Sequence, residues 1–170
     1  MGSSSGIRSR FGRAGLVVAT ASMFMLLAAS CSSKNNVTAG GGTPTENVFV
    51  QKFRFHGMPT TIPSGNLTIN FSNRESLPIT HELVLISLPS GKTAQDVVSD
   101  SKAKDTKAED DWLHFGEIPD VDSGATKAQV FDLPAGTYAF ACWQTGNLGA
   151  PTAKGKAHAA RGMVFQFTVS

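Results

Sequence analysis

Apolar and polar residues alternate in several short segments between residue 48 and the C-terminus. This period of two is typical of half-buried β-strands, because successive side chains of a strand point to opposite faces of a sheet. The pattern predicts strands over residues 48–55 and 67–71. The apolar, branched run 81–86 predicts a more buried strand, and residues 129–133, 138–143 and 163–169 predict three more. Thr93 is a suitable cap for one short helix or irregular excursion that extends to about Lys107. We therefore expect an all-β, antiparallel β-sandwich with Greek-key connections.

The first thirty residues have a different pattern. Arg8, Arg10 and Arg13 precede an apolar run over 14–29, and no acidic residue is present. A basic start, an apolar centre and a small residue at the end are the three parts of a signal peptide. The run is shorter than the ~20 residues that a permanent membrane-spanning helix needs. The sequence therefore predicts a signal peptide over residues 1–30.

The end of this segment, Leu27-Ala28-Ala29-Ser30-Cys31, resembles the bacterial lipobox, in which a cysteine is diacylated and the chain is cut just before it. Two alternatives are an uncleaved anchor and an ordinary secretory signal that leaves Cys31 as a thiol. We expect lipidation of Cys31, which makes the membrane a partner and places the protein at the extracytoplasmic face of a bacterial membrane. Residues 31–47 are small and polar and predict a flexible linker, and residues 48–170 predict one domain.

Charge and motif content exclude several functions. Removal of the three signal arginines from fifteen basic residues leaves twelve against thirteen acidic ones, so we expect no nucleic-acid partner. Acids and lysines alternate over residues 96–111, which is typical of a solvated surface. Nothing resembles a Ser-His-Asp triad, a Gly-rich phosphate loop or a catalytic carboxylate pair, so we expect no enzyme activity.

Four residues suggest a metal site: His81 at the start of a predicted strand, Cys142 at the end of another, then His158 and Met163. If Cys31 is acylated, Cys142 has no disulfide partner. A thiolate and two imidazoles, with a weak axial thioether, are the ligands of blue-copper sites. Taken singly, each residue has an ordinary interpretation as a polar strand edge, a loop residue or core filling. Only their combination predicts copper.

The surrounding segments resemble the cupredoxins, the family that includes plastocyanin and azurin. Its early strands and its recurring asparagine are matched by residues 53–55, 62–65 and 69–73, its first histidine by 78–85, its cysteine by 133–142 and its second histidine and methionine by 158–163. The resemblance spans residues 48–170. It implies the cupredoxin fold and one copper ion in a type 1 site, with His81, Cys142, His158 and Met163 as ligands.

Two features depart from the family pattern. Glu82 follows the first histidine, where many members have an asparagine that ties the two ligand loops together. Cys142 and His158 are sixteen positions apart, whereas the family usually separates them by only a few. The intervening segment 144–157 is rich in Gly, Ala, Thr and Lys and predicts a surface loop.

Three functions agree with these patterns. The first is a membrane-tethered electron carrier that presents the edge of the His158 imidazole to a redox partner. The second is an envelope copper-trafficking protein that exchanges copper with another copper-handling protein. The third is a metal-free cupredoxin-like interaction module, in which Cys142 is buried for packing alone. We expect the first.

Overall fold

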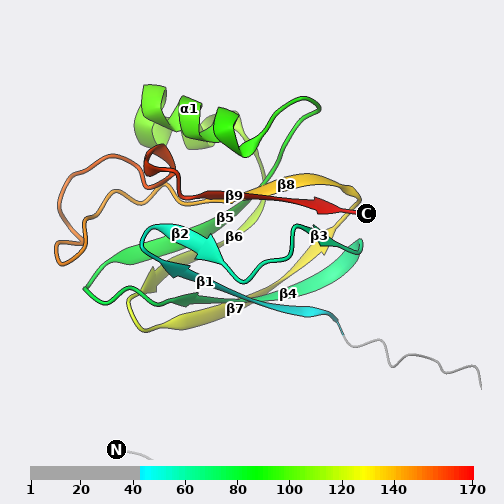
Figure 1. The fold of residues 1–170 in the computed structure, drawn as a ribbon, viewed down its shortest axis with the longest axis horizontal. Coiled ribbons are helices and arrows are strands. Elements are labelled where there is room, and N and C mark those ends of the chain that lie inside the picture. The colour runs from blue at the N-terminus through cyan, green and yellow to red at the C-terminus, as the bar shows by residue number, and fades with distance from the viewer. Residues whose placement is uncertain (1–42) are drawn as a thin grey trace, which may run out of the picture. The chain divides into compact units, whose positions relative to one another are not determined.

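The computed structural model describes residues 43–170, so the expected signal peptide, Cys31 and most of the linker lie outside the described residues. The described strands form a four-stranded sheet in the order β2-β1-β4-β7 and a five-stranded sheet in the order β3-β9-β8-β5-β6 (Figure 1). The strands are β1 (Thr45–Gln51), β2 (Arg54–His56), β3 (Thr61–Ile62), β4 (Gly65–Asn73), β5 (Thr80–Ser87), β6 (Leu113–Asp122), β7 (Thr126–Leu133), β8 (Gly136–Ala141) and β9 (Val164–Val169). The first strand begins three residues before the expected domain start at Val48.

The predicted Greek-key β-sandwich is confirmed, but two of its strand pairings are parallel and not antiparallel. β1 pairs with β4 and β3 pairs with β9 in parallel, whereas the other pairings are antiparallel. The expected helix is α1 (Ala94–Lys104), and a 3-10 helix, η1 (Asp105–Asp111), follows it. The backbone N–H and the hydroxyl of Thr93 both donate to Asp96 Oδ2 at 2.9 Å, which fixes the start of α1. Among the helices in residues 43–170, none has the length and apolar character to cross a membrane.

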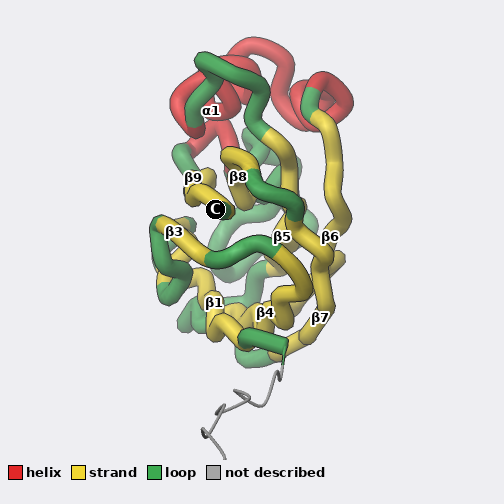
Figure 2. Tube along the Cα trace, turned by 90° about the vertical axis from the view of Figure 1, so that its right-hand side faces the viewer, coloured by secondary structure: helices red, strands yellow, loops and turns green. Residues whose placement is uncertain are grey.

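The five-stranded sheet is covered on both faces. Its inner face packs against the other sheet, and its outer face packs against α1 (Figure 2). β5 shows both environments, because Leu83 and Leu85 belong to the inner cluster while Val84 and Ile86 belong to the outer one. Burial on both faces explains why β5 reads as a nearly continuous apolar run. The strands that carry the site are therefore held in a rigid core.

The predicted strand over residues 48–55 is interrupted by a tight turn. Lys52 and Phe53 have φ angles of 52° and 56° and connect β1 to β2, where Gln51 pairs with Arg54. A positive φ is unfavourable for residues with a side chain, so turns of this kind are normally marked by Gly or Asn. The sequence contains no such signal here, and the turn was missed.

The long edge strand β6 was also not predicted. Its pairing with β5 contains two register shifts, and Gly116, with a φ of 142°, and Pro119 lie within it. Bulges and prolines break the strict alternation of apolar and polar residues from which strands are recognised.

Candidate metal centre

Two neighbouring strands and one returning loop bring the predicted ligands together. His81 is the second residue of β5, and Cys142 immediately follows β8, which pairs with β5. The loop 144–157 then leads back to Cys142, because the Ala159 N–H donates to the Cys142 carbonyl at 2.6 Å. His158 therefore lies beside Cys142 although sixteen residues separate them.

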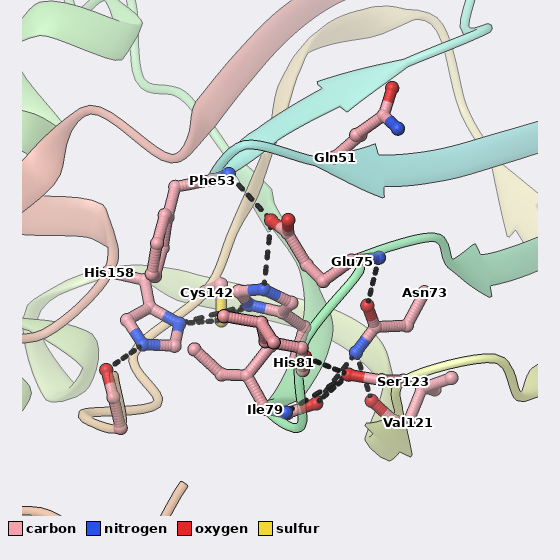
Figure 3. A network of polar contacts seen from close by, with 12 residues as sticks. Gln51, Phe53, Asn73, Glu75, Ile79, His81, Val121, Ser123, Cys142 and His158 are labelled. Carbon is pink, nitrogen blue, oxygen red and sulfur yellow. Dashed lines mark hydrogen bonds and ion pairs between the residues drawn. The ribbon is translucent and has the colours of Figure 1, made fainter. Parts of the chain in front are cut away.

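Three ligand atoms face one another at the end of the sandwich (Figure 3). The Nδ1 atoms of His81 and His158 are 3.0 Å apart, and the Cys142 Sγ atom is 3.3 Å from His158 Nδ1 and 3.7 Å from His81 Nδ1. A point equidistant from all three lies about 2 Å from each, close to the ~2.0 Å of metal–imidazole bonds and the ~2.3 Å of metal–thiolate bonds. All three side chains are fully buried. The arrangement could hold one metal ion, and its donor set suits copper.

Protonation favours metal binding by both histidines. Burial, followed by the neighbouring charge of His158, lowers the pKa of His81 to about 3. Burial also lowers the pKa of His158 to about 4, against the opposing effect of the Gly146 carbonyl. The His158 Nε2 atom lies 2.9 Å from the Gly146 oxygen and donates its proton there, which leaves the Nδ1 lone pair free. Both imidazoles are thus neutral at pH 7, as ligands must be.

The thiol behaves differently. Burial raises the pKa of Cys142, with the nearby charge of Glu82 as a further cause, so the metal-free residue is a thiol at pH 7. A metal ion that binds there must displace the thiol proton, because the thiolate is the ligand form.

Met163 lies close to this group in the chain and in the core. Its side chain is fully buried in the same apolar cluster as Cys142, and its N–H donates to the His158 carbonyl at 3.1 Å. From this placement the thioether would serve as a further, weak ligand of a bound metal. Ligation by the thioether stays a prediction.

The loop and the β1–β2 turn cover His158. The Phe53 ring contacts the two imidazoles edge-on, with centroid distances of 4.9 Å to His158 and 5.5 Å to His81. The Gly146 carbonyl blocks the Nε2 edge of His158. The prediction that His158 presents its imidazole edge to a redox partner is therefore wrong, because Phe53 and the returning loop leave the ring fully buried.

Glu82 ties the two ligand segments together. Its carboxylate accepts hydrogen bonds from the Trp143 N–H at 2.6 Å and from Gln144 Nε2 at 3.2 Å, so it connects the residue after His81 with the residues after Cys142. The glutamate thus makes the connection for which an asparagine was expected. Burial raises the pKa of Glu82 to about 7, although the Trp143 hydrogen bond acts in the opposite direction.

Asn73 holds the segment that leads to His81. It is buried, and its side-chain N–H groups donate to the carbonyls of Ile79 at 2.9 Å and Val121 at 2.8 Å. The sequence resemblance noted this asparagine, and the structure gives its physical role: it fixes the backbone two residues before the first histidine.

Two further residues of the site, Phe53 and Glu75, escaped the sequence analysis. The Glu75 Oε1 atom accepts a hydrogen bond from the Phe53 N–H at 2.8 Å and lies 3.6 Å from His81 Nε2. Glu75 stands among polar residues, as in an exposed turn, and Phe53 continues an alternating strand pattern. Neither position carried a signal that could be recognised without the fold.

Comparisons with solved structures identify the architecture. Reduced auracyanin from Roseiflexus castenholzii matches 76% of this chain and 99% of its own, with 20% sequence identity and a TM-score of 0.53. Auracyanin A from Chloroflexus aurantiacus, described as a blue copper protein, matches 76% of this chain and 100% of its own at 19% identity and a TM-score of 0.50. The domain has the cupredoxin fold. The sequence resemblance to cupredoxins is confirmed at this level, while no protein-family model and no curated protein matches the chain.

Proposed function

We propose that this cupredoxin-fold domain binds one copper ion and carries single electrons. The supporting observation is the convergence of two neutral imidazole Nδ1 atoms and one thiol sulfur in a fully buried site. A sulfur and two imidazoles suit both Cu(I) and Cu(II), and copper supplies the one-electron chemistry when it is bound.

The protein's own contribution is to keep the ligands in place. His81 and Cys142 lie on or beside paired strands of a core that is buried on both faces, and Asn73 and Glu82 brace the backbone around them. Phe53 and the 144–157 loop exclude water from the imidazoles. A centre whose ligands are fixed in this way changes little between oxidation states, which suits electron transfer.

Lipid attachment at Cys31, export and docking to a redox partner complete the proposal. The basic, apolar and small-residue pattern of residues 1–31 supports the first two. Because His158 is covered, the electron would pass through the residues that cover the ring or leave at another point of the surface. Metabolic labelling with a radioactive fatty acid should mark the full chain but not Cys31→Ser, and absence of label from the unchanged chain would contradict lipidation.

The copper centre can be tested by absorption spectroscopy. Residues 36–170 are loaded with Cu(II), and the visible spectrum is recorded for the unchanged chain, Cys142→Ser and His158→Ala. We expect an intense thiolate-to-copper band that both substitutions abolish. His114→Ala is the matched control, because His114 is an exposed histidine, and it should leave the band unchanged.

The alternatives give other results. Absence of the band together with tight Cu(I) binding would favour copper trafficking. Absence of binding by either oxidation state would leave a metal-free interaction module.

A further inference from the structure

Glu75 is a buried acid without a Lys or Arg partner among the described residues. Its side chain is 3% exposed, and the Phe53 N–H is its hydrogen-bond donor. The ion pairs that Lys and Arg form in residues 43–170 involve other acids, namely Asp96, Asp105 and Asp111. A buried carboxylate that lacks a cation is unfavourable, and this site must gain a compensating charge or tolerate the cost.

The neighbour of Glu75 is the ring edge of His81 that points away from the other ligands. His81 Nε2 is buried and has no hydrogen-bond partner in the described part of the chain, and the Glu75 oxygen is 3.6 Å away. Because Nδ1 faces the ligand cluster, Nε2 carries the proton when a metal is bound. Metal-binding histidines commonly direct this second N–H at a carboxylate, which makes the ring a stronger donor.

The backbone holds Glu75 in this position. The Glu75 N–H donates to Asn73 Oδ1 at 3.1 Å, and the Phe53 N–H that binds the carboxylate comes from a residue with a φ of 56°. A phenylalanine with positive φ is strained, and such strain persists where the surroundings impose it. The same turn therefore places the Phe53 ring over the imidazoles and its N–H on Glu75.

A charge count shows what the carboxylate does to a copper ion. Cu(II) with one thiolate and two neutral imidazoles carries a single positive charge, which Glu75 cancels. Cu(I) with the same ligands is neutral, so Glu75 leaves the buried group with a negative charge. Burial in a medium of low polarity favours the cancelled state over the charged one.

We propose that Glu75, acting through His81, makes the centre prefer Cu(II) to Cu(I) and so lowers its reduction potential. This inference rests on the proposed function for its copper, and it adds a positioning residue that controls the oxidation state. Reduction adds one electron, taken from the electrode mediator in the test below, and no protein bond forms or breaks.

The test compares the full-length chain with Glu75→Gln, Glu75→Asp and Glu117→Gln. Glu75→Gln removes the charge and keeps the size, Glu75→Asp keeps the charge and alters the hydrogen-bond geometry, and Glu117→Gln removes an exposed charge of the same sign. Affinities are measured for Cu(II), Cu(I) and the redox-inactive Zn(II), and the copper reduction potential is measured by mediated titration.

We expect Glu75→Gln to weaken Cu(II) and Zn(II) binding by ~10–100-fold, with little effect on Cu(I). Each tenfold selective loss of Cu(II) affinity raises the potential of a one-electron couple by ~59 mV. Glu75→Asp should remain near the unchanged protein. Glu117→Gln should have little effect, because solvent and salt screen an exposed charge.

Every other outcome contradicts the role proposed for Glu75, the electron-carrier function, or both. An unchanged or lowered potential in Glu75→Gln, or an equal change in Glu75→Asp, overturns the proposal. If Zn(II) binding depends on Glu75 but Cu(II) gives no thiolate band, the influence of Glu75 on a divalent ion holds while the electron-carrier function fails. If the unchanged protein binds none of the three ions, both fail.

Discussion

The metal-free domain should lose stability as the pH falls from 6.5 to 4.5. The pKa values of His81 and His158 in the folded protein are about 3 and about 4, below their ordinary value of 6.5. Near the middle of this range, at about pH 5.5, the unfolded chain therefore binds close to two protons that the folded protein does not. When the pKa of a group is lower in the folded protein than in the unfolded chain, the free energy of unfolding rises with pH. Acidification therefore lowers the free energy of unfolding.

Glu82 acts in the opposite direction. Its folded pKa of about 7 lies above the ordinary value of 4.5, so the folded protein binds one proton that the unfolded chain lacks between these two values. Stability from this group is greatest at low pH and is lost as the pH rises through 7. The two histidines and Glu82 together leave a net excess of one proton in the unfolded state.

The magnitude follows from this proton count. One excess proton changes the free energy of unfolding by about 1.4 kcal/mol for each pH unit. Glu82→Gln removes the opposing proton and should steepen the dependence to about 2.7 kcal/mol for each pH unit. The glutamine can still accept the Trp143 hydrogen bond but not the one from Gln144 as well, so the pH slope and not the absolute stability reports the titration.

Urea unfolding in the presence of a chelator measures this dependence. The free energy of unfolding is determined at several pH values, and the denaturant slope is checked for constancy, since a changed slope would indicate an altered folded or unfolded state. Asp132→Asn, at an exposed position, should reproduce the behaviour of the unchanged protein. Stability that is flat or increases on acidification would refute the assignment of buried neutral histidines, and equal slopes with and without Glu82 would refute its raised pKa.

Two further pairs of substitutions test local packing. Trp143 Nε1 donates to the buried Ser101 Oγ at 3.1 Å, so Trp143→Phe should cost ~1–3 kcal/mol. In a urea-unfolding double-mutant cycle, adding Ser101→Ala should cost less than the sum of the single changes, and additive costs would contradict the bond. Gly57 and Gly91 both have a positive φ angle. A Cβ atom added at Gly57 would collide with the Asn47 carbonyl, whereas a Cβ atom added at Gly91 would have no other atom within 4 Å. By thermal unfolding, Gly91→Ala should cost about 1 kcal/mol and Gly57→Ala about 2–4 kcal/mol, and equal losses would exclude the clash.

The sequence was sufficient where the physical cause is local. Alternation of apolar and polar residues predicted β4, and a run of apolar, branched residues predicted β5, because both patterns are properties of a single strand. Thr93 predicted the start of α1 because a helix cap is completed within four residues. The identities of His81, Cys142 and His158 indicated copper because ligand preference is a property of the donor atoms themselves.

Only the tertiary structure decided how these donors are arranged and what surrounds them. The convergence of His81 with His158 depends on strand pairing and on a loop that returns through long-range hydrogen bonds. The same return buries His158, contrary to the sequence-based prediction. Glu75 acquires its place beside His81 because Phe53 adopts a strained turn that no local pattern marks. Distances between residues far apart in the chain set both the burial and the charge of the site, and a one-dimensional pattern does not contain those distances.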